Sequence, residues 1–201
     1  MHKESAAQRG RPREFDIDQA LDRALEVFWR KGYEGASISE LTEAMGINRP
    51  SLYAAFGNKE ELFRKALDRY VKGPAAYTYE ALEAPTARAV AECILRGAAD
   101  ALTDPHSPHG CLGVRGALSC GDAALSIKEE VCARQSEWQA ELQARLERAK
   151  LDGDLSGGAN CADLALYVAT VTRGMAVQAA GGATRKQLRK VADMALQAWP
   201  G

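Results

Sequence analysis

Apolar residues recur at three- and four-residue steps along most of this chain, which is the spacing of one buried face on an α-helix. Over residues 16–31 the repeat consists of Ile17, Ala20, Leu21, Ala24, Leu25 and Phe28. Asp16 precedes the repeat and is a good N-cap, and Gly32 follows it, where a C-cap glycine commonly lies. The pattern therefore predicts a first amphipathic helix over residues 16–31.

Residues 37–45 carry the signals of a second, short helix. Ser37 and Glu40 have the spacing of a capping box, in which each side chain bonds the backbone N–H of the other residue. Gly46 then permits a sharp turn that a residue with a Cβ atom resists. The pattern predicts a helix that begins at Ile38 and ends at a tight turn.

Two further helices follow closely along the chain. Asn48 is a typical N-cap, and Pro50 fits the next helix's first turn, where its missing N–H would have no partner. Gly57 ends that short helix, and Asn58 can cap another over residues 59–71. A short helix, a glycine turn and a second short helix form the arrangement that inserts a recognition helix into the DNA major groove.

Gly73 and Pro74 mark a boundary, after which the helical spacing continues with weaker punctuation. We expect helices over residues 86–102, 110–117, 126–150, 159–180 and 184–199, with a loop over 103–110. The sequence contains no internal repeat, low-complexity tract or strand pattern. It therefore predicts an all-α fold of about nine helices.

Composition supports a packed protein of the cell interior. The 201 residues are 46% hydrophobic, which is enough for a core. No apolar run approaches the ~18 residues that cross a bilayer, and the N-terminus lacks the apolar stretch of a secretory signal. The five cysteines (Cys93, Cys111, Cys120, Cys132 and Cys161) form no C-x-x-C pair. We expect a cytoplasmic protein with reduced thiols and no contact with a membrane.

The distribution of charge is more informative than the net charge of −1. Lys3, Arg9, Arg11 and Arg13 stand against Glu4, so residues 1–13 are locally basic. Such an arm ahead of a folded domain can hold phosphate or enter the minor groove. The alternative is a solvated tail with no partner.

The predicted helix over residues 49–56 has side chains suited to DNA. Arg49 and Ser51 in its first turn can donate hydrogen bonds to base edges or phosphates, and Tyr53 on the same side can donate its hydroxyl to a phosphate. Lys59 begins the next helix, beside N–H groups that suit an anion. The alternative is that these residues only form a solvated surface.

The run GYEGASISELTEAMGINRPSLYAAFGNKEELFRKAL, with the preceding FWRK, resembles the DNA-binding domain of the tetracycline-repressor (TetR) family over residues 13–70. The resemblance implies operator contacts at Ser37, Ser39, Arg49, Pro50, Ser51, Tyr53 and Lys59. Arg11 and Arg13 match only the general habit of a basic arm. The family resemblance also implies that the protein is a repressor. It would bind a palindromic operator on double-stranded DNA and be released by a small-molecule effector.

The family fold implies a division of the chain. We expect a basic arm over residues 1–13, a helix-turn-helix domain over 14–58, a connecting helix over 59–72, and an effector-binding and dimerisation domain over 73–201. In the family the last two helices usually form a four-helix bundle with a second copy. That implies a homodimer interface containing Leu164, Val168, Val171, Met175, Leu188 and Val191. The alternative is that these residues form an internal core face.

The sequence of the effector-binding half says less about function than that of the DNA-binding half. We expect a mostly apolar pocket among the helices of residues 86–180, with Cys111, Arg115, Trp138 and Tyr167 as candidate residues. The Gly-Cys-Leu at the start of a helix resembles one family branch in which some members sense electrophiles or oxidants through a cysteine. Cys111 near a helix N-terminus, with Arg115 four residues on, could therefore be a sensor thiol. The alternative is a small buried hydrophobic residue.

The sequence gives weaker support to a metal site, an enzyme or an interaction module. His106, His109 and Cys111 are possible zinc or copper ligands, but a fourth ligand would have to come from elsewhere in the chain. Exposed loop histidines are the simpler interpretation. A thiol enzyme would need a base near Cys111, and His109 is the only nearby candidate. A third alternative is a helical interaction module that has lost DNA binding. We therefore expect a regulator that is not an enzyme and needs no metal or cofactor.

Overall fold

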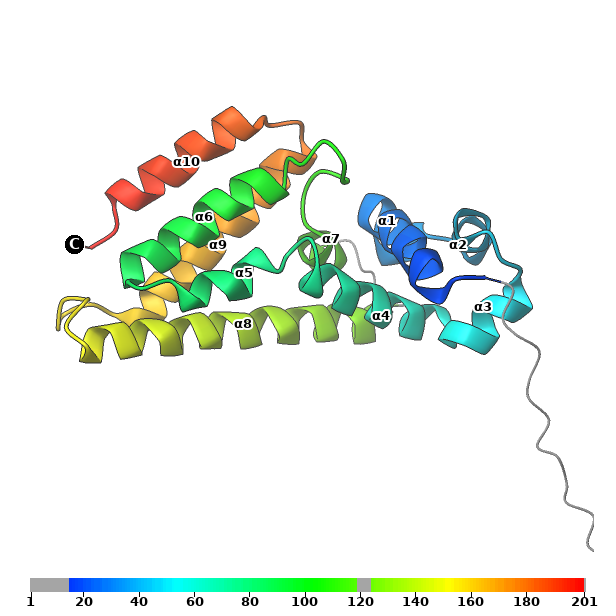
Figure 1. Cartoon of the computed structure of the whole chain (residues 1–201), viewed down its shortest axis with the longest axis horizontal. Coiled ribbons are helices and arrows are strands. Elements are labelled where there is room, and N and C mark those ends of the chain that lie inside the picture. The colour runs from blue at the N-terminus through cyan, green and yellow to red at the C-terminus, as the bar shows by residue number, and fades with distance from the viewer. Residues whose placement is uncertain (1–14, 119–123, 201) are drawn as a thin grey trace, which may run out of the picture.

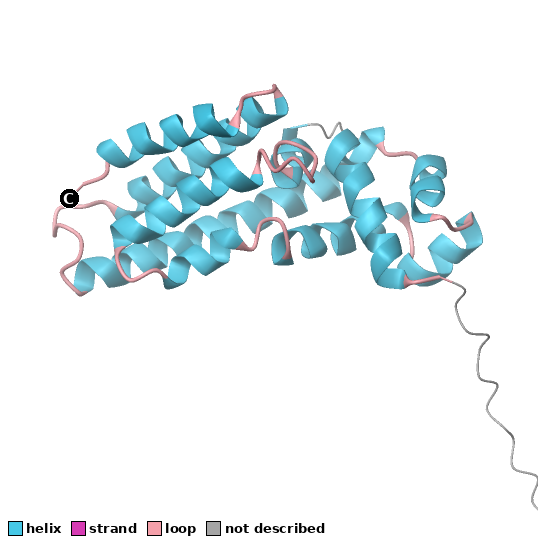
Figure 2. Cartoon of the chain, turned by 45° about the horizontal axis from the view of Figure 1, so that its top comes forward, coloured by secondary structure: helices cyan, strands magenta, loops and turns pink. Residues whose placement is uncertain are grey.

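The computed structural model describes residues 15–118 and 124–200, and within those ranges every regular element is a helix (Figure 2). The helices are α1 (Ile17–Gly35), α2 (Ile38–Met45), α3 (Arg49–Phe56), α4 (Lys59–Lys72), α5 (Tyr77–Glu80), the 3-10 helix η1 (Ala81–Glu83), α6 (Ala87–Ala101), α7 (Leu112–Leu118), α8 (Leu125–Leu151), α9 (Cys161–Ala180) and α10 (Arg185–Gln197). The predicted all-α fold is confirmed. The sequence pattern missed α5 and η1, which are too short to contain a periodic repeat. In the described ranges no helix has the length and apolarity needed to cross a membrane.

The caps predicted for the first helices are confirmed. The Asp16 carboxylate accepts hydrogen bonds from two N–H groups in the first turn of α1, and the Asn48 amide oxygen accepts one from Ser51, at 2.8 Å. Ser37 with Glu40, and Asn58 with Glu61, form reciprocal capping boxes at the starts of α2 and α4. These caps fix where the short helices begin.

Glycines set the angles between the first four helices. Gly46 after α2 has φ 68°, and Gly57 after α3 has φ 77°, in the region that side chains with a Cβ atom disfavour. Gly32 also has a positive φ, of 73°, and its non-helical backbone angles kink α1 at the position predicted for the C-cap. A further turn continues to Gly35, so α1 runs four residues beyond the predicted end.

Two hydrophobic cores lie at opposite ends of an elongated molecule (Figure 1). The first is formed mainly by α1–α4, where Phe28 meets Phe63 edge-to-face with ring centroids 5.1 Å apart. The second is formed by α6, α9, α10 and the C-terminal half of α8. Helices α1–α4 therefore pack around a core that is separate from the second one.

The long helix α8 belongs to both cores. Ile127 and Val131 near its start are buried in the first core, whereas Leu142 and Leu146 are buried in the second. Leu112 at the start of α7 also packs into the first core. The core of the N-terminal half therefore includes residues from beyond position 73, which neighbourhood in sequence could not reveal.

Candidate nucleic-acid interface and ligand cavity

Helices α2 and α3 meet across the Gly46 turn with their apolar sides toward α1 and α4. Leu41 and Met45 of α2, and Leu52 and Phe56 of α3, are all buried. This packing holds the opposite side of α3 toward solvent. The arrangement is the helix-turn-helix that the sequence predicts.

The exposed side of α3 carries Arg49, Pro50 and Tyr53, and 51% of Tyr53 is accessible. The Arg49 guanidinium donates a 2.7 Å hydrogen bond through Nη2 to Oγ of Ser39 on α2. Ser39 therefore holds Arg49 in a defined direction. Ser37 is exposed at the start of α2, and Ser51 is half-buried on α3. The structure thus brings most of the predicted contact residues onto one surface.

Lys59 lies at the start of α4, next to this surface. Its ammonium group is 4.4 Å from the centre of the Tyr33 ring, a distance that allows a cation–π interaction. The ring therefore limits where the ammonium group can lie. The predicted contacts Arg11 and Arg13, with the rest of the arm over residues 1–13, lie outside the described residues.

Glu40 stays ionised beside this surface. A hydrogen bond from Lys31 lowers the pKa of Glu40 to about 2, with further contributions from the backbone and hydroxyl of Ser37. The capping box at the start of α2 is therefore complete at neutral pH. The pair Lys31–Glu40 also ties α1 to α2, which supports the orientation of the helix-turn-helix.

A cavity of about 510 Å³ lies among α4, α5, α6, α7, α8 and α9. Its wall is largely apolar, with Val71, Ile94, Val114 and Trp138 among its residues. The size and lining suit a small organic molecule. The cavity reaches residues of both cores, so a molecule inside it would touch both halves of the protein.

Polar groups occupy a few positions on this wall. Burial, followed by the nearby Cys111, raises the pKa of the Tyr70 hydroxyl, which is within hydrogen-bonding reach of the thiol. Burial also raises the pKa of Tyr77. Both phenols are therefore neutral at physiological pH. The indole N–H of Trp138 already donates to the Thr78 carbonyl, at 3.2 Å.

The four residues proposed for the pocket separate into two groups. Cys111 and Trp138 line the cavity, whereas Arg115 and Tyr167 are not among its lining residues. The Tyr167 hydroxyl instead donates to the Ala195 carbonyl, at 3.3 Å, and so links α9 to α10. Sequence reasoning missed Tyr70 and Tyr77. Tyr70 shares the buried side of α4 with core residues, and Tyr77 lies on the unpredicted α5.

The proposed interface residues on α9 and α10 differ in how far they are exposed. Val168, Met175 and Leu188 are buried inside the chain's own second core. Leu164 and Val171 are half-buried against the same core, and only Val191 is exposed. The exposed large apolar side chains on these helices are Leu166, Val177, Val191 and Met194. The three buried residues thus have the position that the internal-core alternative expects, and the dimer interface stays a prediction.

The loop histidines are placed as the simpler interpretation predicts. His106 and His109 are both exposed. In the ranges that the structure describes, no three His, Cys, Asp or Glu side chains are grouped as metal ligands.

Comparisons with known protein families cover both halves of the chain. Residues 20–66 match a family model described as "Bacterial regulatory proteins, tetR family". Residues 87–194 match one described as "Tetracyclin repressor-like, C-terminal domain".

Individual proteins show the same similarity. The HTH-type transcriptional repressor ComR of Escherichia coli (strain K12) is 32% identical over 194 residues, which cover 96% of this chain and 92% of ComR. The repressor BdcR of the same organism is 31% identical over 194 residues, covering 94% and 91%. A solved structure of a cysteine variant of the regulator CifR, complexed with 26-bp operator DNA, is 43% identical with a TM-score of 0.91. That alignment covers 95% of this chain and 100% of the CifR chain.

Proposed function

This chain belongs to the TetR family of bacterial regulatory proteins, and we propose that it acts as a homodimeric repressor released by a small-molecule effector. It is a DNA-binding transcriptional regulator rather than an enzyme. The observation that carries the proposal is the exposed face of α3 with Arg49 held by Ser39. We place its action in the bacterial cytoplasm, where the DNA lies.

The proposed helix-turn-helix domain, which reads the DNA, comprises residues 14–58 and is preceded by the arm over 1–13. Helix α3 enters the major groove, where Arg49 and Ser51 reach base edges and Tyr53 reaches a phosphate. Lys59 binds a phosphate at the start of α4, and Arg11 and Arg13 hold the neighbouring backbone or minor groove. Ser37, Ser39 and Pro50 complete the contact surface. The similarity in fold to an operator-bound chain supports this placement.

The proposed dimer uses α9 and α10. Leu166 and Val177 are exposed on α9, and Val191 and Met194 are exposed on α10. Within each pair the spacing places both side chains on one side of the helix. A twofold dimer then holds two α3 helices about one turn of DNA apart, ~34 Å, and reads a palindrome.

The proposed effector site is the cavity, within a regulatory part over residues 73–201 that follows the connecting helix over 59–72. An effector that binds one conformation more tightly depopulates the other. Because α4 follows α3 directly and also lines the cavity, a shift of α4 changes the spacing of the two α3 helices. Operator affinity falls in proportion to the effector's preference for the non-binding conformation.

Selection of DNA from a random-sequence library by the purified protein tests the proposed sequence-specific DNA binding. We expect enrichment of an inverted repeat whose half-sites are about 10 base pairs apart, because each protomer presents one α3 helix. Sequencing of the retained DNA measures this directly. Retention of DNA without any enriched sequence at low salt would contradict sequence-specific repression.

A second candidate for the signal is a thiol-reactive compound, favoured by one observation. Cys111 lies on the cavity wall beside the Tyr70 hydroxyl, so a reactive molecule in the cavity would meet its sulfur. We expect a thiol oxidant to release the selected operator from the wild-type protein but not from Cys111→Ser, in a gel-shift titration. Cys132→Ser, which changes an exposed cysteine, is the matched control and should stay sensitive. Equal release from all three proteins would reject the thiol sensor.

A further inference from the structure

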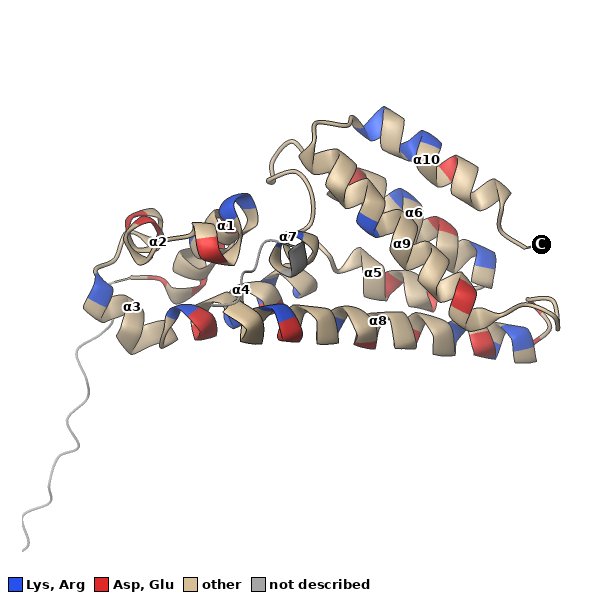
Figure 3. Cartoon of the chain, turned by 180° about the vertical axis from the view of Figure 1, so that it is seen from behind, with Lys and Arg blue, Asp and Glu red and all other residues tan. Residues whose placement is uncertain are grey.

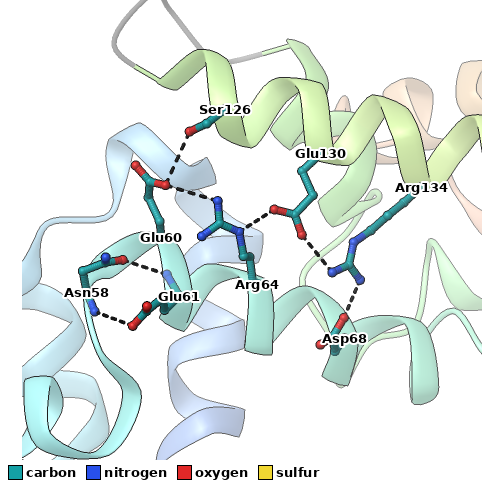
Figure 4. Close-up of polar contacts among 8 residues, drawn as sticks. All are labelled: Asn58, Glu60, Glu61, Arg64, Asp68, Ser126, Glu130 and Arg134. Atoms are coloured by element: carbon teal, nitrogen blue, oxygen red, sulfur yellow. Dashed lines mark hydrogen bonds and ion pairs between the residues drawn. The ribbon is translucent and has the colours of Figure 1, made fainter.

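A chain of ion pairs and hydrogen bonds joins α4 to α8 (Figure 4). Its members are Glu60, Arg64 and Asp68 on α4, and Ser126, Glu130 and Arg134 on α8, and we name them the α4–α8 network. Arg64 Nε donates to Glu130 Oε2 at 2.5 Å, and Arg134 Nη2 donates to Glu130 Oε1 at 2.9 Å. Arg134 also binds Asp68 through Nη1. Glu130 and Arg134 are thus each held by a residue of α4.

The network extends toward the start of α4. Arg64 Nη2 donates to Glu60 Oε2 at 3.2 Å, and the Ser126 hydroxyl donates to the same oxygen at 3.4 Å. Acidic and basic positions lie along both α4 and α8 (Figure 3), and within the network they alternate from Glu60 to Arg64 to Asp68. These long side chains therefore link two helices that run side by side.

Glu130 is the most enclosed of the charged members, with 25% of its side chain exposed. Burial alone would raise the pKa of Glu130, but hydrogen bonds from Arg64 and Arg134 outweigh it and lower that pKa below its ordinary value. The carboxylate is therefore ionised at neutral pH and depends on both arginines. Partial enclosure makes such pairs stronger than those in open solvent.

Two members of the network, both on α8, also line the cavity. Glu130 and Arg134 line the cavity, whereas Arg64 and Asp68 do not. An occupant that takes up the oxygens of Glu130 or the Nη groups of Arg134 competes with α4 for them. Only Gly57 and Asn58 separate α4 from α3, so a change in how α4 is held reaches α3 directly.

We propose that the α4–α8 network is the element that couples cavity occupancy to DNA affinity, with Arg64 and Asp68 as positioning residues. The proposal rests on the proposed effector function. With the network intact, α4 is held against α8 in its DNA-binding position. An occupant with a polar or charged group draws Glu130 or Arg134 into the cavity, breaks their bonds to α4 and releases it.

A second route crosses between the same halves and provides the competing explanation. The Trp29 indole N–H on α1 donates to the Gly110 carbonyl at 3.0 Å, and Tyr70 on α4 reaches Cys111. If this route carried the coupling, altering the α4 side of the network would leave the coupling unchanged. The experiment must therefore change Arg64 and Asp68 and leave the cavity wall alone.

The test uses 1-anilinonaphthalene-8-sulfonate, whose aromatic rings suit the cavity and whose sulfonate can compete for Arg134. Energy transfer from tryptophan to the probe that falls in Trp138→Phe would place the probe beside Trp138 in the cavity. The dissociation constant of the probe is measured with and without saturating selected operator, and their ratio is the coupling factor. By linkage, the probe weakens operator binding by the same factor.

For the wild-type dimer we expect a coupling factor of roughly 10. The double variant Arg64→Met, Asp68→Asn should bind the probe within about twofold of wild type, because neither residue lines the cavity, yet its coupling factor should fall below about 2. Its operator affinity without probe should also fall by about threefold or more, since the network no longer holds α4. Asp68→Asn alone, the milder change, should lower the coupling factor part of the way.

Arg96→Met is the matched control, because Arg96 joins α6 to α10 through Asp193 away from the cavity and α4. It should keep the full coupling factor. A factor near 10 in the double variant would overturn the network and leave the effector proposal standing. A factor of 1 in the wild-type protein would overturn the effector proposal itself, and the network with it.

Discussion

Replacing Arg49 by alanine should weaken binding to the selected operator by at least roughly 30-fold and remove the preference at the base pair that Arg49 contacts. A good bidentate contact discriminates against a wrong base by about 1–3 kcal/mol, and the dimer makes the contact twice. The expected loss is therefore about 2–6 kcal/mol, where each ~1.4 kcal/mol is a factor of ten. Fluorescence anisotropy with the operator and with half-site variants measures affinity and preference.

Two further variants, at Ser39 and at Lys59, separate the effect of Arg49 from a general loss of DNA binding. Ser39→Ala removes the 2.7 Å hydrogen bond that directs Arg49 and should abolish a smaller part of the same preference. Lys59→Ala should weaken binding to all sequences similarly and lower the salt slope by about 1 for each phosphate that is no longer neutralised. An Arg49→Ala protein that keeps the wild-type base preference would show that α3 reads DNA through other residues.

The second large effect concerns the exposed apolar side chains of α10. Met194 is 69% exposed and Val191 is 42% exposed, and both lie on the side of α10 away from the second core. The double variant Val191→Asp, Met194→Asp would bury four carboxylates in the proposed dimer interface, where charge is strongly disfavoured. We expect a folded monomer at micromolar concentration and a loss of operator affinity of at least about 100-fold, since one half-site remains.

Sedimentation velocity and circular dichroism together measure this result. Leu151→Asp is a matched control, because Leu151 is 86% exposed at the end of α8 and lies outside the proposed interface. It should leave the dimer intact. A double variant that sediments as a dimer and binds operator normally would show that another surface joins the protomers. Leu188→Asp is not a suitable test, because Leu188 is buried and the change would unfold α10.

Local sequence rules were sufficient wherever the decisive interaction spans a few residues. The caps at Asp16, Ser37, Asn48 and Asn58, and the turns at Gly46 and Gly57, were all predictable. Each depends on a hydrogen bond to a residue two or three positions away or on the backbone freedom of glycine. These signals set the order and angles of α1–α4, so the sequence alone determined the helix-turn-helix and which side of α3 is exposed.

Tertiary packing decided which side of an evenly apolar helix is buried. Helix α9 has large apolar side chains around most of its circumference, including Val168 and Met175 as well as Leu166 and Val177. Periodicity could not distinguish its sides, because it identifies a buried stripe only when the opposite side is polar. Contact with α6, α8 and α10 buried the first pair and left the second exposed.

The cavity and its link to the DNA-binding half were also beyond the sequence. Arg64 and Glu130 are 66 positions apart, as are Asp68 and Arg134, and no rule of helical spacing relates them. Tyr70 and Cys111 meet only because α7 packs against α4. The sequence by itself determined the fold class, the helix-turn-helix and the family, since these depend on local hydrogen bonds and contiguous motifs. Only the tertiary structure decided the cavity lining, the ion pairs around it and the exposed apolar surface, because each depends on side chains brought together from distant segments.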